Sequence, residues 1–421
     1  MCRKLQNISV HLCGASMGLY LIWLLLPAVQ TTGRAMTGAA CVMLFAVGVV
    51  MDWAYFKANF ADLILRAVCA ALLPLGLRVF MNRGGTNFAG FYVQQVMFWF
   101  PLIFAGYARR RGDRRMWKHL RWILLLTVAI TVCTTIGWLI QGMLRGGRIY
   151  AYSRSLGYAG EGREAYLKEL MLRNIGGYDF VYAMVAALPL SCILIGQHKG
   201  WKRGAFIVLI VLQTVMILLS QYTYAMLYAA AILAVEVLAL ILRRLSKGRI
   251  GLGASLLWSL TPFLVMFLLR QPLVMLAANL CRSLGMSNVA FSMEQLLLAL
   301  QGQATSADSR LSYYLIAANG FLRSPVWGSL FGAEKMLSLH SDVLDLLSGT
   351  GVLGALLTAG MIFLMGRGSL AGVRRHPQRA QLIVCACAVF VTALLGTVVY
   401  SRDILAVTVI GTLLILEGES Q

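Results

Sequence analysis

Long, uninterrupted apolar runs dominate this sequence and constrain its fold more than any other feature. They extend over about 17–22 residues and are continuous rather than alternating. In the hydrocarbon of a bilayer every backbone polar group needs an internal partner, so such runs predict membrane-spanning helices and not barrel strands. The sequence predicts twelve spans, at about residues 10–28, 36–54, 62–80, 89–107, 122–141, 179–196, 205–221, 223–242, 251–269, 351–366, 381–398 and 401–416.

The charged residues are too few for a soluble protein. Only 13% of the 421 residues are charged and 59% are hydrophobic, whereas about 25% of the residues in a soluble domain are charged. A soluble chain could not cover its surface with so few charges. The composition therefore excludes a cytosolic enzyme, a secreted disulfide scaffold and a disordered protein. It predicts an all-α polytopic integral membrane protein with a single transmembrane domain over residues 1–421.

Basic residues are concentrated in four short loops, which together hold 18 Lys and Arg and one acid. Two long loops, 143–178 and 271–350, hold ten Lys and Arg and eight acids. Because cytoplasmic loops accumulate basic residues, we expect the short loops and both termini in the cytoplasm and the long loops outside. The same bias explains the net charge of +21 without nucleic acid, for which the chain has no binding motif. The short loops are 109–121, 197–204, 243–249 and 367–380.

The two outer loops are too long to be simple connections. The larger one contains three apolar stretches, residues 293–300, 311–321 and 343–347. These stretches predict short helices that lie against the outer membrane surface or fold over it. Such helices either seal the bundle as a passive cap or build a site where lipid meets water.

His340 is the only one of the five histidines in an outer loop. Imidazole is the natural proton acceptor near neutral pH, although an isolated histidine in a polar loop is more often merely solvated. The neighbouring residues favour a functional role, because they form an ordered series of motifs. In chain order these are Ala307-Asp308-Ser309-Arg310, Phe321-Leu322-Arg323-Ser324-Pro325, Gly328, Gly332, His340-Ser341-Asp342-Val343-Leu344-Asp345-Leu346-Leu347 and Gly351-Val352-Leu353-Gly354.

This series resembles the O-antigen ligase and O-antigen polymerase superfamily. The resemblance is strongest over about residues 300–365, and the twelve predicted spans, with the large outer loop between the ninth and tenth, agree with it. It implies a glycosyltransferase of the bacterial plasma membrane that uses neither a metal nor another cofactor. Such an enzyme takes a glycan from an undecaprenyl-diphosphate carrier and attaches it to a glycan or lipid-glycan acceptor at the outer face of the membrane.

The resemblance gives two residues a chemical role. Arg310 matches the family's loop arginine, and a guanidinium can bind two phosphate oxygens at once. His340 matches the family's histidine, which implies a general base or a hydrogen-bonding group for the diphosphate or the acceptor. Asp342 and Asp345 follow closely. One of them could orient the imidazole, but complementing the positive end of a helix explains both equally well.

One position departs from the family pattern. The family commonly has an arginine near the outer turn between the seventh and eighth spans, where this chain has Gln221. Glutamine can donate a hydrogen bond to a phosphate but brings no charge. Either another arginine supplies the charge, with Arg323 and Arg402 as candidates, or the activity or substrate differs. Anchoring at lipid head groups explains Arg323 and Arg402 equally well.

Other functions are less favoured by the sequence. Glu236 is a candidate site residue because it lies within the eighth predicted span, but pairing with Arg66 or contact with water explains it as well. No group of His, Cys, Asp and Glu has metal-ligand spacing, and no nucleotide-binding loop is present. The alternative function is a transporter or flippase of lipid-linked saccharide, but the chain shows no related halves, which transporters typically have. The sequence does not distinguish a polymerase from a ligase.

Overall fold

The computed structural model is almost entirely helical. Helices account for 90% of it, and the described residues contain no strand. The all-α prediction is therefore confirmed for this part of the chain. The described residues are 2–62, 65–66, 68–69, 72, 114–146, 164–245, 261, 264–265, 268–301, 308–329, 340–370, 379–395 and 402–418.

Five helices of the described part are long and apolar enough to cross a membrane. They are α1 (Cys2–Leu25), α6 (Arg114–Gly146), α9 (Tyr178–Gln197), α10 (Trp201–Ser220) and α16 (Asp342–Leu370). Helix α2 (Pro27–Met51) adds a sixth if its two parts, which meet at 91°, form one broken span. These helices support a multi-spanning membrane protein. Three of the twelve predicted spans, at 62–80, 89–107 and 251–269, lie mostly or wholly outside the described residues.

The remaining helices are shorter or less continuous. The predicted helices at 293–300 and 311–321 are confirmed as parts of α14 and α15, whereas α8 and α13 were not predicted. Their bounds are α3 (Trp53–Ala58), α8 (Glu164–Leu172), α11 (Thr223–Leu245), α13 (Arg270–Ser283), α14 (Ser287–Leu300), α15 (Asp308–Arg323), α17 (Arg379–Leu395), α18 (Arg402–Leu405), the π-helix η2 (Ala406–Ile410) and α19 (Gly411–Gly418).

Several helix boundaries differ from the prediction, and in α2 and α16 the difference changes how segments are joined. Helix α2 begins at Pro27, where Pro fits because the first turn needs no N–H partner, and it breaks at Gly33 instead of beginning near residue 36. Helix α16 begins at Asp342 and continues through a kink at Gly351, so the predicted short helix 343–347 and the predicted span 351–366 are two segments of one element.

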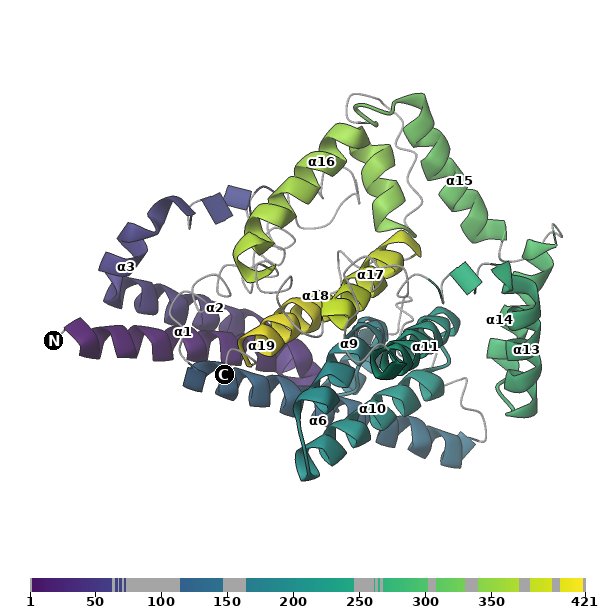
Figure 1. Ribbon diagram of the computed structural model, residues 1–421, viewed down its shortest axis with the longest axis horizontal. Helices are drawn as coiled ribbons and strands as arrows, with labels where there is room; N and C mark the ends of the chain where they lie inside the picture. Colours follow the sequence, from purple (N-terminus) through teal and green to yellow (C-terminus); the bar gives the residue numbers. More distant parts are fainter. Residues whose placement is uncertain are drawn as a thin grey trace.

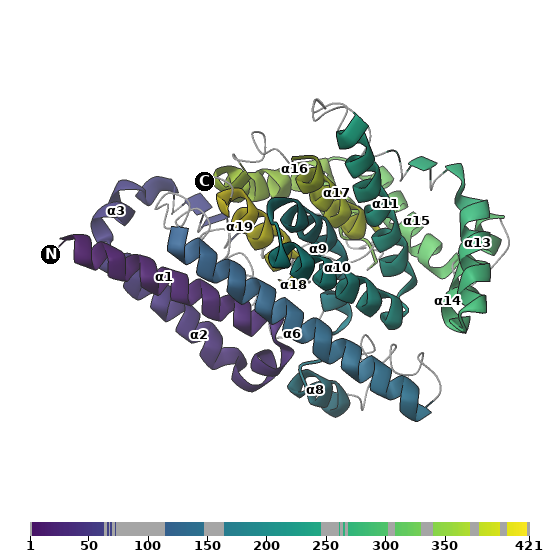
Figure 2. The same ribbon diagram turned by 60° about the horizontal axis from the view of Figure 1, so that its bottom comes forward.

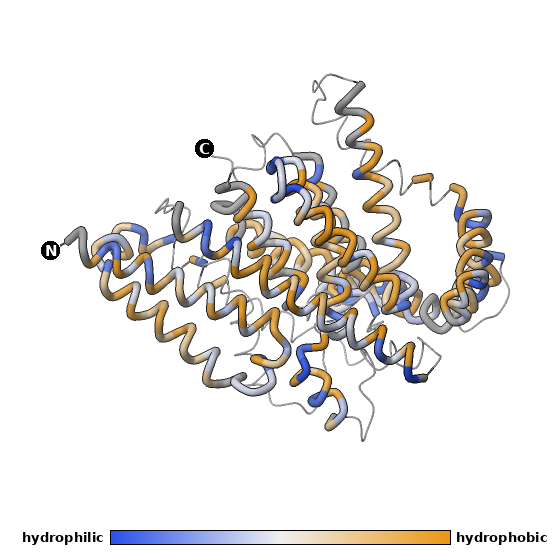
Figure 3. Tube along the Cα trace, turned by 90° about the horizontal axis from the view of Figure 1, so that it is seen from below, coloured by the Kyte–Doolittle hydropathy of each residue, from blue (hydrophilic) through white to orange (hydrophobic). Residues whose placement is uncertain are grey.

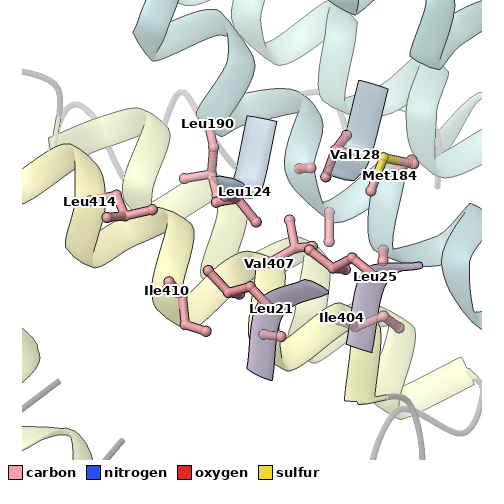
Figure 4. Close-up of a cluster of buried hydrophobic side chains, with 14 of the residues drawn as sticks. Leu21, Leu25, Leu124, Val128, Met184, Leu190, Ile404, Val407, Ile410 and Leu414 are labelled. Carbon is pink, nitrogen blue, oxygen red and sulfur yellow. The ribbon is translucent and has the colours of Figure 1, made fainter. Parts of the chain in front are cut away.

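Helix α9 lies at the centre of the described bundle, as Figures 1 and 2 show. It packs against α10, α11, α17, α18 and α19, and nearly all of its residues from Phe180 to Leu194 are buried. A helix that is apolar on every side is stable only when other apolar groups surround it. Figure 4 shows how α1, α6 and the C-terminal helices complete this core. The labelled side chains are Leu21, Leu25, Leu124, Val128, Met184, Leu190, Ile404, Val407, Ile410 and Leu414.

Hydroxyl groups and small residues join neighbouring helices. Ser9 and Ser16 of α1 donate hydrogen bonds to the carbonyls of Gly48 and Cys41 of α2, at 2.6 and 2.7 Å. A Cβ atom on Gly48 would lie 2.6 Å from Sγ of Cys13, so a larger residue there would push the helices apart. Such close approach with interhelical hydrogen bonds is typical of helix pairs in membranes.

Many large apolar side chains are exposed at the outer surface, and the hydropathy colours along the trace in Figure 3 show that apolar residues predominate in most of the helices. Helix α16 is the clearest example, because its second segment exposes large apolar groups where a soluble protein would carry charges. This surface is stable only against an apolar solvent, which supports insertion of α16 in a bilayer. The exposed residues are Val352, Leu353, Leu356, Leu357, Ile362 and Phe363.

Candidate functional site

The turn that follows α15 docks on the kink of α16. At the kink the N–H groups of Val352 and Leu353 lose their partners within the helix, and the carbonyls of Pro325 and Val326 accept them at 2.8 and 3.3 Å. In return, the backbone N–H of Ser329 donates to the carbonyl of Ser348 at 2.9 Å. The kink therefore leaves these backbone groups hydrogen-bonded, because the turn after α15 replaces the helical hydrogen bonds that the kink removes.

Two glycines make this docking possible. Gly328 and Gly351 both have positive φ, of 58° and 64°. A Cβ on Gly351 would lie 2.2 Å from the carbonyl oxygen of Val326, and one on Gly328 would lie 2.6 Å from the backbone of Ser348. Only glycine combines that backbone conformation with that contact distance. These are two of the glycines in the motif series, and the contacts give them a structural role.

His340 lies two residues before the start of α16 and is half-buried. Its ring centroid is 5.2 Å from that of Tyr313 on α15, with the ring planes tilted by 57°. Ser341 caps the helix, since its hydroxyl accepts the N–H of Leu344 at 3.2 Å. The cap and the aromatic contact fix the imidazole between α15 and the first turn of α16.

Polar side chains continue along the first segment of α16. Asp342 and Asp345 lie in its first turn, and both are buried, as are Ser341 and Ser348. The positive end of the helix stabilises carboxylates at these positions, so the helix explanation accounts for both acids. A role of Asp342 in orienting His340 stays a prediction.

The arginine candidates fall at different places. Arg310 is in the first turn of α15, three residues before Tyr313, and its side chain lies outside the described part. Arg323 is exposed at the opposite end of this 16-residue helix, about 20 Å from Arg310 along the axis at the usual helical rise. Arg402 is the first residue of α18, and its side chain also lies outside the described part. The backbone thus brings Arg310, but not Arg323, to the His340 end of α15.

Gln221 occupies the tight turn that the sequence predicted between two spans. Helix α10 ends at Ser220 and α11 begins at Thr223. Gln221 has a left-handed backbone (φ 54°), and its N–H donates to the carbonyl of Leu218 at 3.2 Å. Its side-chain Oε1 is buried without a hydrogen-bond partner among the described residues. Figures 1 and 2 show α17 between this turn's helices and α16.

Three tyrosines pack beside Gln221. The ring of Tyr178 is 4.6 Å from Tyr182 and 5.0 Å from Tyr222, and Tyr182 and Tyr222 are stacked at 6.5 Å. Burial raises the pKa of the Tyr222 phenol, and Tyr178 and Asp179 raise it further. The phenol therefore stays protonated at physiological pH. Sequence analysis missed this cluster, because the start of α9 and the α10–α11 turn are far apart in the chain.

Threonines of α6 hold the segment between α8 and α9. Thr131 donates to the carbonyl of Leu25 at 2.7 Å and accepts Nδ2 of Asn174 at 3.1 Å. Thr134 donates to the carbonyl of Asn174 at 2.7 Å, and Thr135 accepts the N–H of Gly176 at 2.8 Å. These bonds tie three parts of the chain together at the entrance to α9.

A small cavity lies between α6, α9, α10 and α19, away from His340. Its volume is about 40 Å³, and its walls are mostly apolar. Ser191 donates to Oε1 of Gln213 at 3.1 Å inside it, and Arg121 lies at its border. Figure 4 labels several wall residues, including Leu124, Val407 and Leu414.

Glu236 is only 3% exposed, so the explanation that it faces water is wrong for this structure. It lies within electrostatic range of Cys192 and Cys385, on α9 and α17. Arg66 forms an ion pair with Asp62 at 3.1 Å. Glu236 is thus part of the packed helix bundle rather than of the His340 region.

Within the described residues, no three His, Cys, Asp or Glu side chains are grouped closely enough to hold a metal ion. Comparison with known protein families finds no match, and comparison with curated proteins finds no relative. The functional interpretation therefore depends on the motif series and on the geometry around His340.

Proposed function

We propose that this protein transfers a glycan from an undecaprenyl-diphosphate carrier to a glycan or lipid-glycan acceptor at the outer face of the plasma membrane. The proposed reaction is that of a surface-polysaccharide polymerase or an O-antigen-type ligase, without a metal ion. The observation that carries the proposal is the contact of His340 with Tyr313. This contact joins the start of α15 to the start of α16, two segments that are separated in the sequence by the rest of α15 and by residues 324–341.

The position of Arg310 supports a shared site. Residues three apart on a helix face the same side, about 5–6 Å apart at Cβ, and Arg310 precedes Tyr313 by three residues. An arginine there is within reach of a ligand that also touches His340. Its guanidinium remains charged at any relevant pH and can bind two phosphate oxygens together.

The proposed chemistry needs few groups. An acceptor hydroxyl oxygen attacks the anomeric carbon, and the bond from that carbon to the diphosphate oxygen breaks. The diphosphate leaves with the electron pair and is already a weak base, so Arg310 stabilises its charge and no general acid is required. His340 takes the proton of the acceptor hydroxyl.

Further residues are proposed to bind the substrate. Gln221 is proposed to bind the glycan or the diphosphate: its unpartnered buried Oε1 accepts a hydrogen bond from a glycan hydroxyl, or its amide NH2 group donates one to a diphosphate oxygen. Arg402 and Asp342 are further candidates for substrate binding, and Arg323 is a weaker one because it lies at the far end of α15. The transporter alternative gains nothing from the cavity near Ser191, which is too small for a saccharide and mostly apolar.

The test uses purified protein, an undecaprenyl-diphosphate oligosaccharide and an acceptor in the presence of EDTA. We expect a new glycosidic linkage and free undecaprenyl diphosphate. His340→Ala is expected to lower the rate by about 10²–10⁴-fold, the usual effect of losing a general base, and Arg310→Ala to lower it at least as much. Matched controls are His198→Ala, whose ring contacts the Leu194 carbonyl, and Arg173→Ala, which pairs with exposed Glu169.

Both control variants are expected to transfer glycan at the wild-type rate. Wild-type transfer by His340→Ala and Arg310→Ala would remove these two residues from the site. Movement of the carrier-bound glycan across the bilayer without a new linkage would instead establish the transporter alternative.

A further inference from the structure

Helix α13 carries an apolar stripe that no described part of the protein covers. Leucines recur every three or four residues along the helix and its two ends, so they lie on one face. All are exposed, with Leu276 and Leu280 at 66% and 57%. The stripe consists of Leu269, Leu273, Leu276, Leu280 and Leu284.

The helix has two other faces with different surroundings. Val274, Ala278 and Cys281 are buried in the core that α13 shares with α14. Gln271 and Arg282 are exposed on the side opposite the stripe, together with Met275, and Arg282 pairs with Glu294 of α14. The leucine stripe is therefore not the side that packs the hairpin together, and it needs another apolar environment.

The position of α13 identifies that environment. The core of the α13–α14 hairpin includes contacts with Met226 and Leu227, in the first turn of α11 next to the turn at Gln221. Residues directly before α13, including Leu264, Val265 and Leu268, are also apolar and exposed, and they end a predicted span. The apolar surface thus continues from the end of the predicted span 251–269 into α13. This places α13 at the depth of the membrane–water interface.

The charged residues of α13 agree with contact between this helix and lipid. Helix α13 has no acid, and of its two arginines Arg282 pairs with Glu294 of α14, and the exposed Arg270 suits contact with phosphate head groups. A leucine face beside a polar face that bears arginine is typical of helices that lie in the membrane interface. Figures 1 and 2 show α13 and α14 side by side at the edge of the molecule, and the exposed fractions of the leucines show that the stripe is accessible.

We propose that α13 lies along the surface of the bilayer with its leucine stripe inserted among the lipids, and so anchors the large loop to the membrane. This anchor holds the segment that leads through α14 to α15 close to the lipid surface. The proposal is independent of glycosyl transfer, since it depends only on the helix and on the membrane that the chain spans.

The test compares Leu276→Cys and Leu280→Cys with the matched control Gln271→Cys, an exposed position on the side of the same helix opposite the stripe. The full-length variants are placed in nanodiscs of phosphatidylethanolamine and phosphatidylglycerol, with wild-type thermal unfolding as the criterion of folding. Each is treated with a charged maleimide or a lipid-soluble maleimide, and mass spectrometry identifies the labelled residue. Native Cys281 is 7% exposed, and burial raises its thiol pKa, so it reacts slowly with both reagents.

At the two leucine positions we expect labelling by the charged reagent to be about tenfold or more slower than at Gln271→Cys, and the order to reverse with the lipid-soluble reagent. Equal labelling of all three positions by the charged reagent would show that the stripe lies in water. Resistance of the leucine positions to both reagents would show that protein, such as a second copy of the chain, covers them. Either result would overturn the proposal.

Discussion

At the residue scale, Gln221 combines an unfavourable backbone with an unsatisfied side-chain atom. Only Gln221 and Asn174 have positive φ among the described non-glycine residues. Each has one buried side-chain oxygen without a hydrogen-bond partner in the described structure, Oδ1 of Asn174 and Oε1 of Gln221, but other hydrogen bonds, to Thr131 and Thr134, tie Asn174 in place. Strained residues of this kind concentrate at functional sites, which supports a ligand role for the Gln221 amide.

Substitutions at Gln221 separate the effect of its backbone conformation from the effect of its side-chain amide. Gln221→Gly is expected to stabilise the protein by about 1 kcal/mol, because glycine adopts the left-handed conformation without steric cost. The same change removes the amide and is expected to raise KM for the lipid-linked donor. Thermal unfolding and transfer kinetics measure the two effects separately.

Gln221→Ala is the matched control, since it removes the amide but keeps the unfavourable backbone. It is expected to raise KM as the glycine variant does, without the gain in stability. Wild-type KM in both variants would mean that the amide binds no substrate, and the departure from the family arginine would then have no bearing on the site.

At the element scale, the kink of α16 positions the start of that helix. The turn from Ser324 to Ser329 supplies the hydrogen bonds that the kink removes, and the contact of Tyr313 with His340 lies at the other end of the same α15–α16 pair. The geometry around His340 therefore depends on a contact between backbones at Gly328 and Gly351.

Gly351→Ala is expected to destabilise the protein by about 2 kcal/mol or more, because it combines a positive φ with a backbone clash. Gly360→Ala, in the same helix, is the control: a Cβ there meets nothing within 4 Å. It is expected to be neutral or to stabilise by about 0.5–1 kcal/mol through helix propensity. Thermal unfolding in detergent compares the two, and equal stability of both variants would contradict the docking of the turn on the kink.

The sequence predicts some of these features and not others, for physical reasons. Apolar runs mark the spans, and the polar interruption at Ser220-Gln221-Tyr222 marks the tight turn, because both signals are local. The kink at Gly351 is not local, since the partner carbonyls of Pro325 and Val326 come from another segment. The sequence places the start of a span at Gly351, but only the structure, with that segment in place, shows that the preceding short helix continues into the span through a kink.

The same distinction applies to the candidate site. His340 was identified by its isolation in an outer loop and by its neighbours, whereas the tyrosines at 178, 182 and 222 come together only through the packing of α9 on α10 and α11. Helix α13 was missed because its apolar residues are divided between a buried face and an exposed face. The apolar residues of α13 therefore do not form the single stripe by which an amphipathic helix is recognised in a sequence.

At the scale of the whole molecule, the uneven distribution of basic residues predicts how the chain crosses the membrane. Arg173, just after α8, and Lys199, just after α9, should lie on opposite sides because one span separates them. A periplasmic alkaline phosphatase fused after Arg173 is expected to be active, and a fluorescent protein that matures in the cytoplasm is expected to be bright after Lys199. The opposite pattern would invert the topology and place His340 on the cytoplasmic side.

The central claim is that one ligand, a polyprenyl diphosphate, contacts the start of α15 and the start of α16 together. Photo-crosslinking with a polyprenyl diphosphate that carries the reactive group beside the phosphates measures this directly, with adducts located by mass spectrometry. We predict adducts in both segments, near Arg310 and near His340, that excess unlabelled carrier prevents. Adducts confined to other helices, such as those around the cavity near Ser191 and Gln213, would contradict the claim.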